Sequence, residues 1–251
     1  MKLLRVKYDN NIYFGALEGG DIRLLKNSIY ADEFQFTDIT LPADRAKLLS
    51  PVVPSKIVCA GLNYKDHAKE LNMDIPEDPT LFLKPSTAVI GHGDDIIYPE
   101  SVTRLDYEAE LAVVIKKQAK DVSKESVFDY ILGYTCLNDV TARDLQKKDI
   151  QWTRAKSFDT FAPVGPYIIT GIDPSDLSVR SYVNGKARQS SSTSDMIFDV
   201  GSLVCFISRV MTLLPGDIIA TGTPKGVGEL QRGDSVVVEV ESIGELKNKV
   251  I

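Results

Sequence analysis

The sequence has few of the residues that hold small secreted domains or cysteine-ligated metal sites together. Its three cysteines, Cys59, Cys136 and Cys205, are widely spaced in apolar surroundings, and no Cys-x-x-Cys pair occurs. An odd number of isolated cysteines argues against a disulfide framework or a cysteine-ligated zinc site and predicts buried, reduced thiols. We therefore expect a cytoplasmic protein.

The sequence also lacks an excess of positive charge and any long apolar run. It has 29 Lys and Arg residues against 35 Asp and Glu residues, a net charge of -6, so no basic field is present to attract nucleic acid. Met1–Lys7 carries charges every few residues and no apolar core, which argues against a signal peptide. No window approaches the length of a membrane span. Neither nucleic acid nor a membrane is an expected partner.

The residues that are present have an ordinary globular composition, with 43% hydrophobic and 25% charged residues. A length of 251 residues suits one large domain with a small appendage. Residues 1–50 contain short alternating runs between turn residues, which predict a small N-terminal β domain. Pro51 and Pro54 predict a stiff connector. Residues 55–251 are expected to form the main domain.

Three patterns predict helices and strands of the main domain that carry no candidate site residues. Apolar residues at helical spacing predict an amphipathic helix over 196–213. Asn184-Gly185 predicts a tight hairpin, because this turn needs positive φ at both positions. Ser235–Val240 predicts a last strand, followed by a short tail.

A strand with two acidic side chains is the central candidate feature. Leu105–Ile115 ends in a continuous apolar, β-branched run, which predicts a strand buried on both faces. Side chains two apart on a strand share a face, so Glu108 and Glu110 lean together. Two buried carboxylates need a cation or a shared proton, and a hard divalent cation suits oxygen ligands. Taken alone, the pair also fits a solvated strand end with a surface salt bridge.

A histidine and a glutamate form a second candidate group. Asn63 is expected to cap a short helix on which His67 and Glu70, three residues apart, share a face. The glutamate would fix the tautomer of the imidazole and raise its basicity, as for a general base with its orienting partner. The alternative is a weakly stabilising pair on a helix surface. The other histidine, His92, lies in a turn-rich loop and is expected to be exposed.

Polar residues after the buried strand Ile131–Leu137 form a third group. Asp139, Arg143 and Gln146 fall at i, i+4 and i+7, which predicts one face of a helix capped at the strand end. An Arg fork binds a carboxylate ligand, and a Gln holds a carbonyl or a water. The alternative is that Asp139 only caps the helix and pairs with Arg143.

Two lysines and a glycine-rich segment complete the candidates. Lys84 ends an apolar strand, where a surface lysine is equally compatible with the pattern. Lys156 lies in the segment 151–166, which has neither helical nor strand period, and could partner a developing negative charge. In Thr221–Gly228, alternating Gly and Thr lets backbone N–H groups and hydroxyls approach a ligand carboxylate. The segment lacks the ending of a Walker sequence.

Together these segments resemble the fumarylacetoacetate hydrolase family from about residue 55 to the C-terminus. The resemblance is carried, in chain order, by Gly61–Tyr64 with His67 and Glu70, Phe82–Ser86, Asp106–Leu111, Asn138–Gln146, Lys156–Thr160 and Thr221–Gly228. The chain is most similar to the short acylpyruvate hydrolase and decarboxylase branch. It lacks the longer N-terminal domain and the further Asp ligand of fumarylacetoacetate hydrolase itself, whose substrate is therefore not expected here.

The resemblance implies an α+β fold built on a rolled, mixed β-sheet, a homodimer, and a divalent cation, Mg²⁺ or Mn²⁺. The residues it implies are Glu108, Glu110 and Asp139 for the metal, His67, Glu70 and Lys156 for catalysis, and Arg143, Gln146, Thr223 and Lys84 for the substrate.

The implied substrate is a small-molecule 2-oxo acid. The leading hypothesis is metal-dependent hydrolysis of a C–C bond in an acylpyruvate, through an enolate that the cation and Lys156 stabilise. Oxaloacetate decarboxylation and isomerisation of 2-hydroxy-dienedioates of the hydroxymuconate type remain alternatives within the family. His67 and Glu70 favour hydrolysis or decarboxylation, since the isomerases resemble members without this helix. A non-catalytic oxo-acid-binding protein is the alternative from another class.

Overall fold

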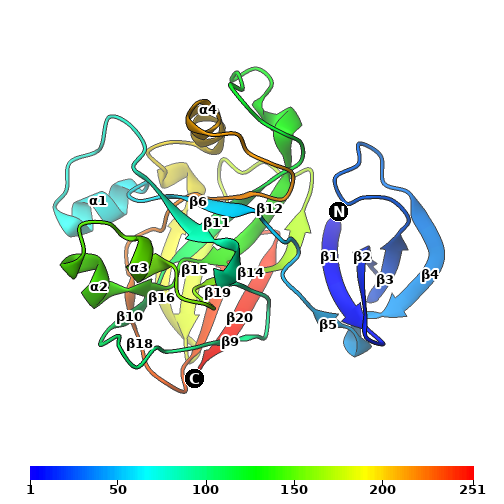
Figure 1. Cartoon of the computed structure of the whole chain (residues 1–251), viewed down its shortest axis with the longest axis horizontal. Helices are drawn as coiled ribbons and strands as arrows, with labels where there is room; N and C mark the ends of the chain where they lie inside the picture. Colours follow the sequence, from blue (N-terminus) through cyan, green and yellow to red (C-terminus); the bar gives the residue numbers. More distant parts are fainter.

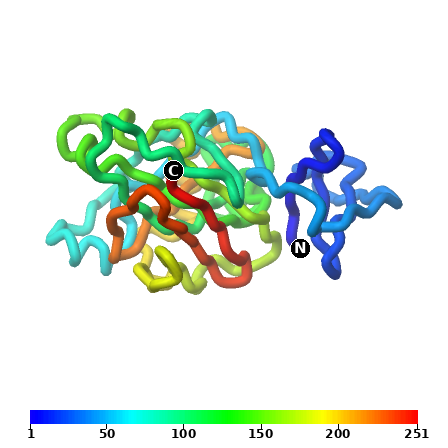
Figure 2. Tube along the Cα trace, turned by 90° about the horizontal axis from the view of Figure 1, so that it is seen from below, coloured from blue at the N-terminus to red at the C-terminus, as the bar shows by residue number.

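The computed structural model describes residues 1–251, which form β-sheets with few helices. A small N-terminal β unit lies at one end of the long axis, to the right in Figure 1, and the remainder of the chain forms the larger body (Figures 1 and 2). This arrangement confirms the predicted α+β class. No helix has the length and hydrophobicity needed to cross a membrane.

The largest sheet has 12 strands and runs from the N-terminal unit into the main body through the pairing of β1 with β14. It is mixed, since β17 is parallel to β6 and β8 is parallel to β14, while the other pairs are antiparallel. In spatial order its strands are β4 (Phe36–Pro42), β3 (Asp21–Leu25), β2 (Asn11–Glu18), β1 (Lys2–Tyr8), β14 (Ala162–Ile169), β12 (Ile131–Asn138), β11 (Ala109–Ile115), β17 (Ile218–Ala220), β6 (Lys56–Ala60) and β7 (Leu81–Pro85), with β5 (Lys47–Leu48) on β1 and β8 (Val89–Ile90) on β14.

Two smaller sheets and the helices complete the fold. The three-stranded sheet has the order β13 (Thr141–Ala142), β10 (Leu105–Tyr107), β18 (Gly228–Leu230); the five-stranded sheet has β16 (Lys186–Ser192), β15 (Ser178–Val183), β19 (Ser235–Val240), β20 (Gly244–Val250), β9 (Asp95–Ile96). The α-helices are α1 (Lys65–Leu71), α2 (Arg143–Lys148), α3 (Thr153–Lys156) and α4 (Val200–Val210), and the 3₁₀ turns are η1 (Ala43–Arg45), η2 (Ser86–Ala88), η3 (Val127–Tyr130) and η4 (Thr193–Asp195).

Strand β11 is buried on both faces, as its sequence predicts. Leu111 and Val113 belong to a core cluster that also takes in residues of α4 and the five-stranded sheet. Ala112 and Val114 point the other way, into a cluster formed with β6, β14 and β17. The alternation of side chains along a strand therefore separates two cores. Glu110 shares the parity of Ala112 and Val114.

Several sequence-based boundaries were wrong. The strand predicted over Leu105–Ile115 is interrupted at Glu108, between β10 and β11. The helix predicted over 196–213 is shorter, because Asp199 caps it through the backbone N–H of Ser202 and it ends at Val210. The tail after β19 pairs with it as β20. Segment 151–166, expected to be irregular, contains α3 and the start of β14.

Two predicted helix caps were also wrong. Asn63 does not cap α1, because its amide donates instead to the carbonyls of Phe198 and Thr221. These hydrogen bonds hold the segment before α1 against the loop after β17. Asp139 lies outside α2, which begins four residues later, since β13 intervenes between β12 and that helix. The hairpin at Asn184-Gly185 is confirmed, with φ of 52° and 75° at the two positions.

Asp217 joins β17 to the start of β6, and its replacement by Asn is expected to destabilise the fold. Its buried carboxylate accepts from the backbone N–H groups of Ser55, Lys56 and Leu214 and pairs with the Lys56 ammonium. Burial alone would raise its pKa, but the hydrogen bonds from Lys56 and Ser55 lower it. We expect a loss of about 2 kcal/mol at pH 7, typical for hydrogen bonds to a charged group.

The contribution of Asp217 to the free energy of unfolding should depend on pH. A carboxyl group with a lowered pKa in the folded state stabilises the protein above its unfolded pKa, about 4, and this stabilisation disappears as the pH falls. Urea unfolding should therefore show a difference between wild type and Asp217→Asn that shrinks below pH 4. Asp38→Asn, on an exposed position of β4, is the control. A difference independent of pH would contradict this account.

Candidate active site

Three acidic side chains meet at one place in the main body, as predicted. Glu108 precedes β11, Glu110 lies on it, and Asp139 follows the neighbouring strand β12. The ladder pairs Ala109 with Asn138, which sets the three side chains beside each other. All three are buried, and one carboxylate oxygen from each lies within 4.8 Å of the others.

Two buried lysines contact these acids from different elements. Lys156, at the end of α3, donates to Glu108 Oε2 at 2.9 Å and to Asp139 Oδ2 at 2.5 Å. Lys84, on β7, donates to Asp139 and to the carbonyl of Val140. Burial would lower the pKa of Lys156, but Asp139 and Glu108 raise it above its ordinary value. The acids that Lys156 contacts therefore hold its ammonium group in the charged form.

Glu108 and Glu110 have opposite electrostatic surroundings. Burial would raise the pKa of Glu108, but Lys156 and Arg143 hold it far below its ordinary value. Glu110 has no basic partner, and its Oε2 accepts only the backbone N–H of Gly222 at 2.8 Å. Burial, followed by the charges of Asp139 and Glu108, raises its pKa well above the ordinary value. The cluster thus contains a buried carboxylate whose charge no protein cation balances.

The donor set fits a divalent cation. Oxygen-only ligands, tightly grouped and with one uncompensated carboxylate, are what Mg²⁺ and Mn²⁺ bind, and Glu108, Glu110 and Asp139 could hold such an ion.

An arginine fork lies beside the acids at the start of α2. Arg143 donates through Nε to Asp106 Oδ2 at 2.8 Å, and its terminal nitrogens donate to Glu108 and Gln146. Burial opposes its charge, but Glu108 and Asp106 raise its pKa. Arg143 and Gln146 both line the cavity described below. The helix thus presents an Arg and an amide together, as the sequence predicts.

The predicted histidine pair forms on α1. His67 Nδ1 lies 2.9 Å from Glu70 Oε2, and Nε2 has no protein partner. Glu70 also accepts the backbone N–H of Gly226, at 3.1 Å. Asp66 accepts from Ser191 Oγ and from the N–H of Lys225. The helix is therefore docked onto the loop after β17 and onto β16 by its own acidic side chains.

The loop after β17 approaches the acids through a residue without a side chain. Gly222 has a φ of +93°, and a Cβ there would lie 2.8 Å from the Cβ of Asn63, so only glycine fits this position. Thr223 donates to the carbonyl of Ala109 and accepts from Gln189 Nε2. These bonds fix the Thr223 hydroxyl at the cavity wall.

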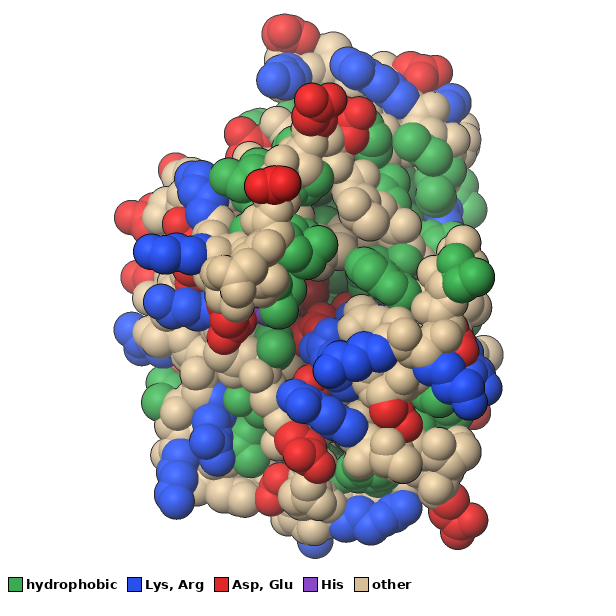
Figure 3. All heavy atoms as spheres, turned by 90° about the vertical axis from the view of Figure 1, so that its left-hand side faces the viewer, with side chains coloured by type: hydrophobic (Ala, Val, Ile, Leu, Met, Phe, Trp, Pro, Cys, Tyr) green, Lys and Arg blue, Asp and Glu red, His purple; other side chains and the backbone are tan.

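A cavity of about 400 Å³ opens beside this cluster. The face that carries α1, α2 and α3 is hollowed near its centre, with acidic side chains in the depth and Lys and Arg side chains nearby (Figure 3). Of the predicted residues, His67, Glu108, Arg143, Gln146, Lys156 and Thr223 line the cavity. Asp139 and Glu70 contact Lys156 and His67 without lining the cavity themselves, and Glu110 lies behind the wall, with a carboxylate oxygen within 4.8 Å of one of Glu108.

Lys84 was predicted to bind substrate, and its position does not support that role. Its side chain is fully buried and its ammonium is directed to Asp139 and to the carbonyl of Val140, so it is not part of the cavity wall. It positions Asp139.

Some residues of the site were not recognised from the sequence. Asp106 is fully buried and binds both Arg143 and Arg104. Its parity with Glu108 and Glu110 was an available signal. Asp66 and Gln189 support α1 and Thr223 through contacts distant in sequence, for which the sequence contains no local signal.

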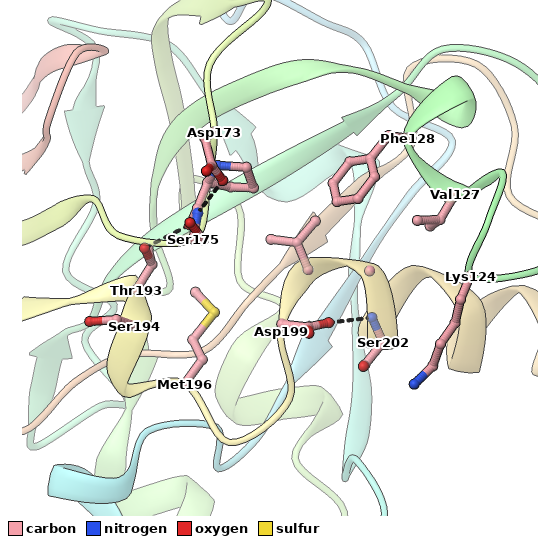
Figure 4. Close-up of a pocket in the computed structure, with 13 residues that line it drawn as sticks. Lys124, Val127, Phe128, Asp173, Ser175, Thr193, Ser194, Met196, Asp199 and Ser202 are labelled. Atoms are coloured by element: carbon pink, nitrogen blue, oxygen red, sulfur yellow. Dashed lines mark hydrogen bonds between the residues drawn. The ribbon is translucent and has the colours of Figure 1, made fainter.

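A second cavity, of about 430 Å³, lies at the start of α4 and is not connected with this chemistry (Figure 4). Its wall includes Val127, Phe128 and Met196, and none of the predicted site residues. Its acidic groups are used locally, with Asp199 accepting the N–H of Ser202 and Asp173 accepting the N–H of Ser175. The cavity beside the acids is therefore the candidate active site.

A mixed β-sheet body in which a buried carboxylate triad, the buried Lys156 and a histidine dyad meet beside one cavity defines a class of enzyme. Residues 56–251 match the family described as fumarylacetoacetate (FAA) hydrolase, C-terminal, and residues 1–51 match the Rv2993c-like N-terminal family. The chain belongs to the fumarylacetoacetate hydrolase family.

Relatives within this family are named for several different reactions. Oxaloacetate tautomerase YisK from Bacillus subtilis is 48% identical over 81% of this chain and 73% of its own. The structure of 2-hydroxyhepta-2,4-diene-1,7-dioate isomerase from Mycobacterium marinum has 45% identity and a TM-score of 0.94, covering 100% of this chain and 98% of that one. Maleylpyruvate hydrolase from Sphingobium sp. SYK-6, in complex with manganese(II) and pyruvate, has 30% identity and a TM-score of 0.83, covering 100% and 99%.

Proposed function

We propose that this family member is a divalent-metal-dependent enzyme that converts 2-oxo acids through their enolates, with proton transfer between keto and enol forms as its principal reaction. The observation that carries the proposal is the buried acidic triad, with its uncompensated Glu110, next to a cavity lined by a histidine with a free Nε2. The relatives named as a tautomerase and as an isomerase, at 48% and 45% identity, support proton transfer over the hydrolysis first expected.

The residues have complementary roles in this proposal. Bound at Glu108, Glu110 and Asp139, Mg²⁺ or Mn²⁺ would act as a Lewis acid on the oxygens of the 2-oxo acid. Arg143 and Gln146 hold the substrate carboxylate, and the Lys156 ammonium stabilises the charge that develops on the C2 oxygen. His67, oriented by Glu70, takes the proton from C3 and gives it to the C2 oxygen, and carries it back in the reverse direction.

Hydrolysis of acylpyruvates is the second candidate, and the His67–Glu70 pair is the observation that favours it. In that reaction His67 takes a proton from a water that adds to the distal carbonyl. The C–C bond then breaks, and C3 leaves as the carbon of an enolate that is protonated to the 2-oxo acid. Decarboxylation of oxaloacetate would pass through the same kind of enolate. The three reactions therefore need the same stabilising groups.

The test follows both kinds of reaction on one purified protein. In D₂O, loss of the C3 proton signal of 2-oxo acids reports enolisation, and loss of enol absorbance of an acylpyruvate reports cleavage. We expect exchange with Mg²⁺ or Mn²⁺ present and its loss with excess chelator, restored by added metal. Exchange indifferent to chelation would contradict the metal-dependent proposal. Binding without turnover of any substrate would favour the non-catalytic alternative.

We also propose that the protein is a homodimer, which the family resemblance supports. A cytoplasmic location is proposed as well, and the three free, buried cysteines support it.

A further inference from the structure

We infer that Arg104 and Lys147 form a distal carboxylate site, so that the enzyme prefers 2-oxo dicarboxylates to 2-oxo acids with a neutral end. This inference rests on the proposed function, because it concerns the far end of the substrate in the same cavity. No role was assigned to either residue from the sequence, and neither contacts the acidic triad. Both line the cavity.

Arg104 is held toward the cavity with donors unused. Its Nε and Nη2 donate to the two oxygens of Asp106, at 2.9 and 3.2 Å, while Nη1 has no protein acceptor. Asp106 is fully buried and also accepts from Arg143 Nε. One carboxylate thus fixes two guanidinium groups, and Arg104 keeps free N–H groups for an anion. Its side chain is 45% exposed, so a ligand can reach it.

The order of contacts separates Arg104 from the triad by two intervening residues. Arg143 bridges Glu108 and Asp106, and Asp106 in turn binds Arg104. Arg104 therefore lies one carboxylate farther from the triad than Arg143 does. A 2-oxo acid with its head at the triad would present a terminal group in the direction of Arg104.

The charge of the cavity wall agrees with a dianionic ligand. The basic residues of the wall are Arg104, Arg143, Lys147 and Lys156, and its acidic residues are Asp106 and Glu108. This wall has two more cations than carboxylates, in a chain whose overall net charge is -6. Lys147 is exposed and has no ion-pair partner. A local cationic excess on an acidic protein attracts anionic ligands.

The other wall of the cavity makes a neutral-ended substrate the competing possibility. Leu71 and Met73 line it, together with Trp152, whose ring packs edge-on against Phe82 at 5.4 Å. An apolar tail could rest on this wall without using Arg104. Substrates that differ only in their terminal group separate the two cases.

The experiment compares 2-oxoadipate with 2-oxohexanoate, which have six carbons each and differ in the terminal carboxylate. With the full-length protein and Mn²⁺, calorimetry measures binding and C3 proton exchange measures kcat/KM. We expect wild type to favour 2-oxoadipate in both. Arg104→Gln should reduce that preference about tenfold, as for a lost hydrogen bond to a charged group. Arg104→Lys should retain part of it, and exposed Lys147→Gln should reduce it less.

Matched controls and alternative outcomes are available in the same chain. Arg154 binds Asp149 with the same bidentate geometry and does not line the cavity, so Arg154→Gln should keep the preference, as should Lys148→Gln. Equal binding of both ligands by wild type would overturn the inference, and so would an undiminished preference for 2-oxoadipate in Arg104→Gln. If C3 proton exchange were still observed, the proposed function would stand. A preference in binding that Arg104→Gln reduces, without exchange of either ligand, would support the inference and contradict the proposed function.

Discussion

Glu110→Gln is expected to abolish Mn²⁺ binding and, at the same time, to stabilise the metal-free protein. The side chain keeps its size and still accepts the N–H of Gly222, but it no longer has the charge that a divalent cation needs. Enolisation should fall by on the order of 10³, because the electrostatic stabilisation of the enolate is lost. Calorimetry with Mn²⁺ and C3 exchange measure the two losses.

The stability of the metal-free protein separates this account from simple misfolding. A carboxyl group whose pKa is raised in the folded state, as for Glu110, destabilises the fold increasingly as the pH rises above its unfolded pKa of about 4.3. Replacing it with Gln should therefore raise the free energy of unfolding of the metal-free protein at pH 7. The gain should vanish below pH 4. Glu245→Gln, at an exposed position of β20, should change neither property.

Two results would contradict this prediction. One is Mn²⁺ affinity in Glu110→Gln close to that of wild type, which would place the metal elsewhere. The other is a metal-free variant less stable than wild type, which would mean that the pKa of Glu110 is not raised in the folded protein.

His67→Ala is expected to lower kcat for C3 exchange by about 10² to 10⁴, the contribution of a positioned general base. Its imidazole lines the cavity and is oriented by Glu70, while the metal ligands lie on other elements. Binding of Mn²⁺ and of oxalate, which has no C3 proton, should therefore persist. Glu70→Gln should give a smaller loss, since it removes the orienting partner and keeps the base.

The other histidine supplies the matched control. His92 lies in the loop after β8 and accepts the backbone N–H of Lys247, away from the cavity. His92→Ala should retain full exchange activity. If His67→Ala also retained it, the base would have to be another group of the cavity.

Two members of the acidic triad could be predicted from a local rule, and the third, Asp139, was implied by the family resemblance. Parity along a strand puts Glu108 and Glu110 on one side, and the burial of β11 and β12 brings Asp139 beside them. The histidine pair follows from helical spacing in the same way. The broad α+β class was implied by the family resemblance, and the sheets and few helices of the structure agree with it.

What could not be predicted depends on contacts between distant segments. Lys84 reaches Asp139 across 55 residues of sequence, so its burial had no local signal. The short strand β13 moved Asp139 off the helix that its spacing with Arg143 suggested. Asn63 was assigned to a cap because its propensity allows it, whereas its amide is used by Phe198 and Thr221.

The most direct test of the account is the position of a bound metal. A crystal of the protein grown with Mn²⁺ should show, in anomalous scattering, one strong peak coordinated by Glu108, Glu110 and Asp139, with open coordination positions facing the cavity. A peak at any other group of residues, or none at this triad under conditions where Mn²⁺ supports exchange, would contradict it.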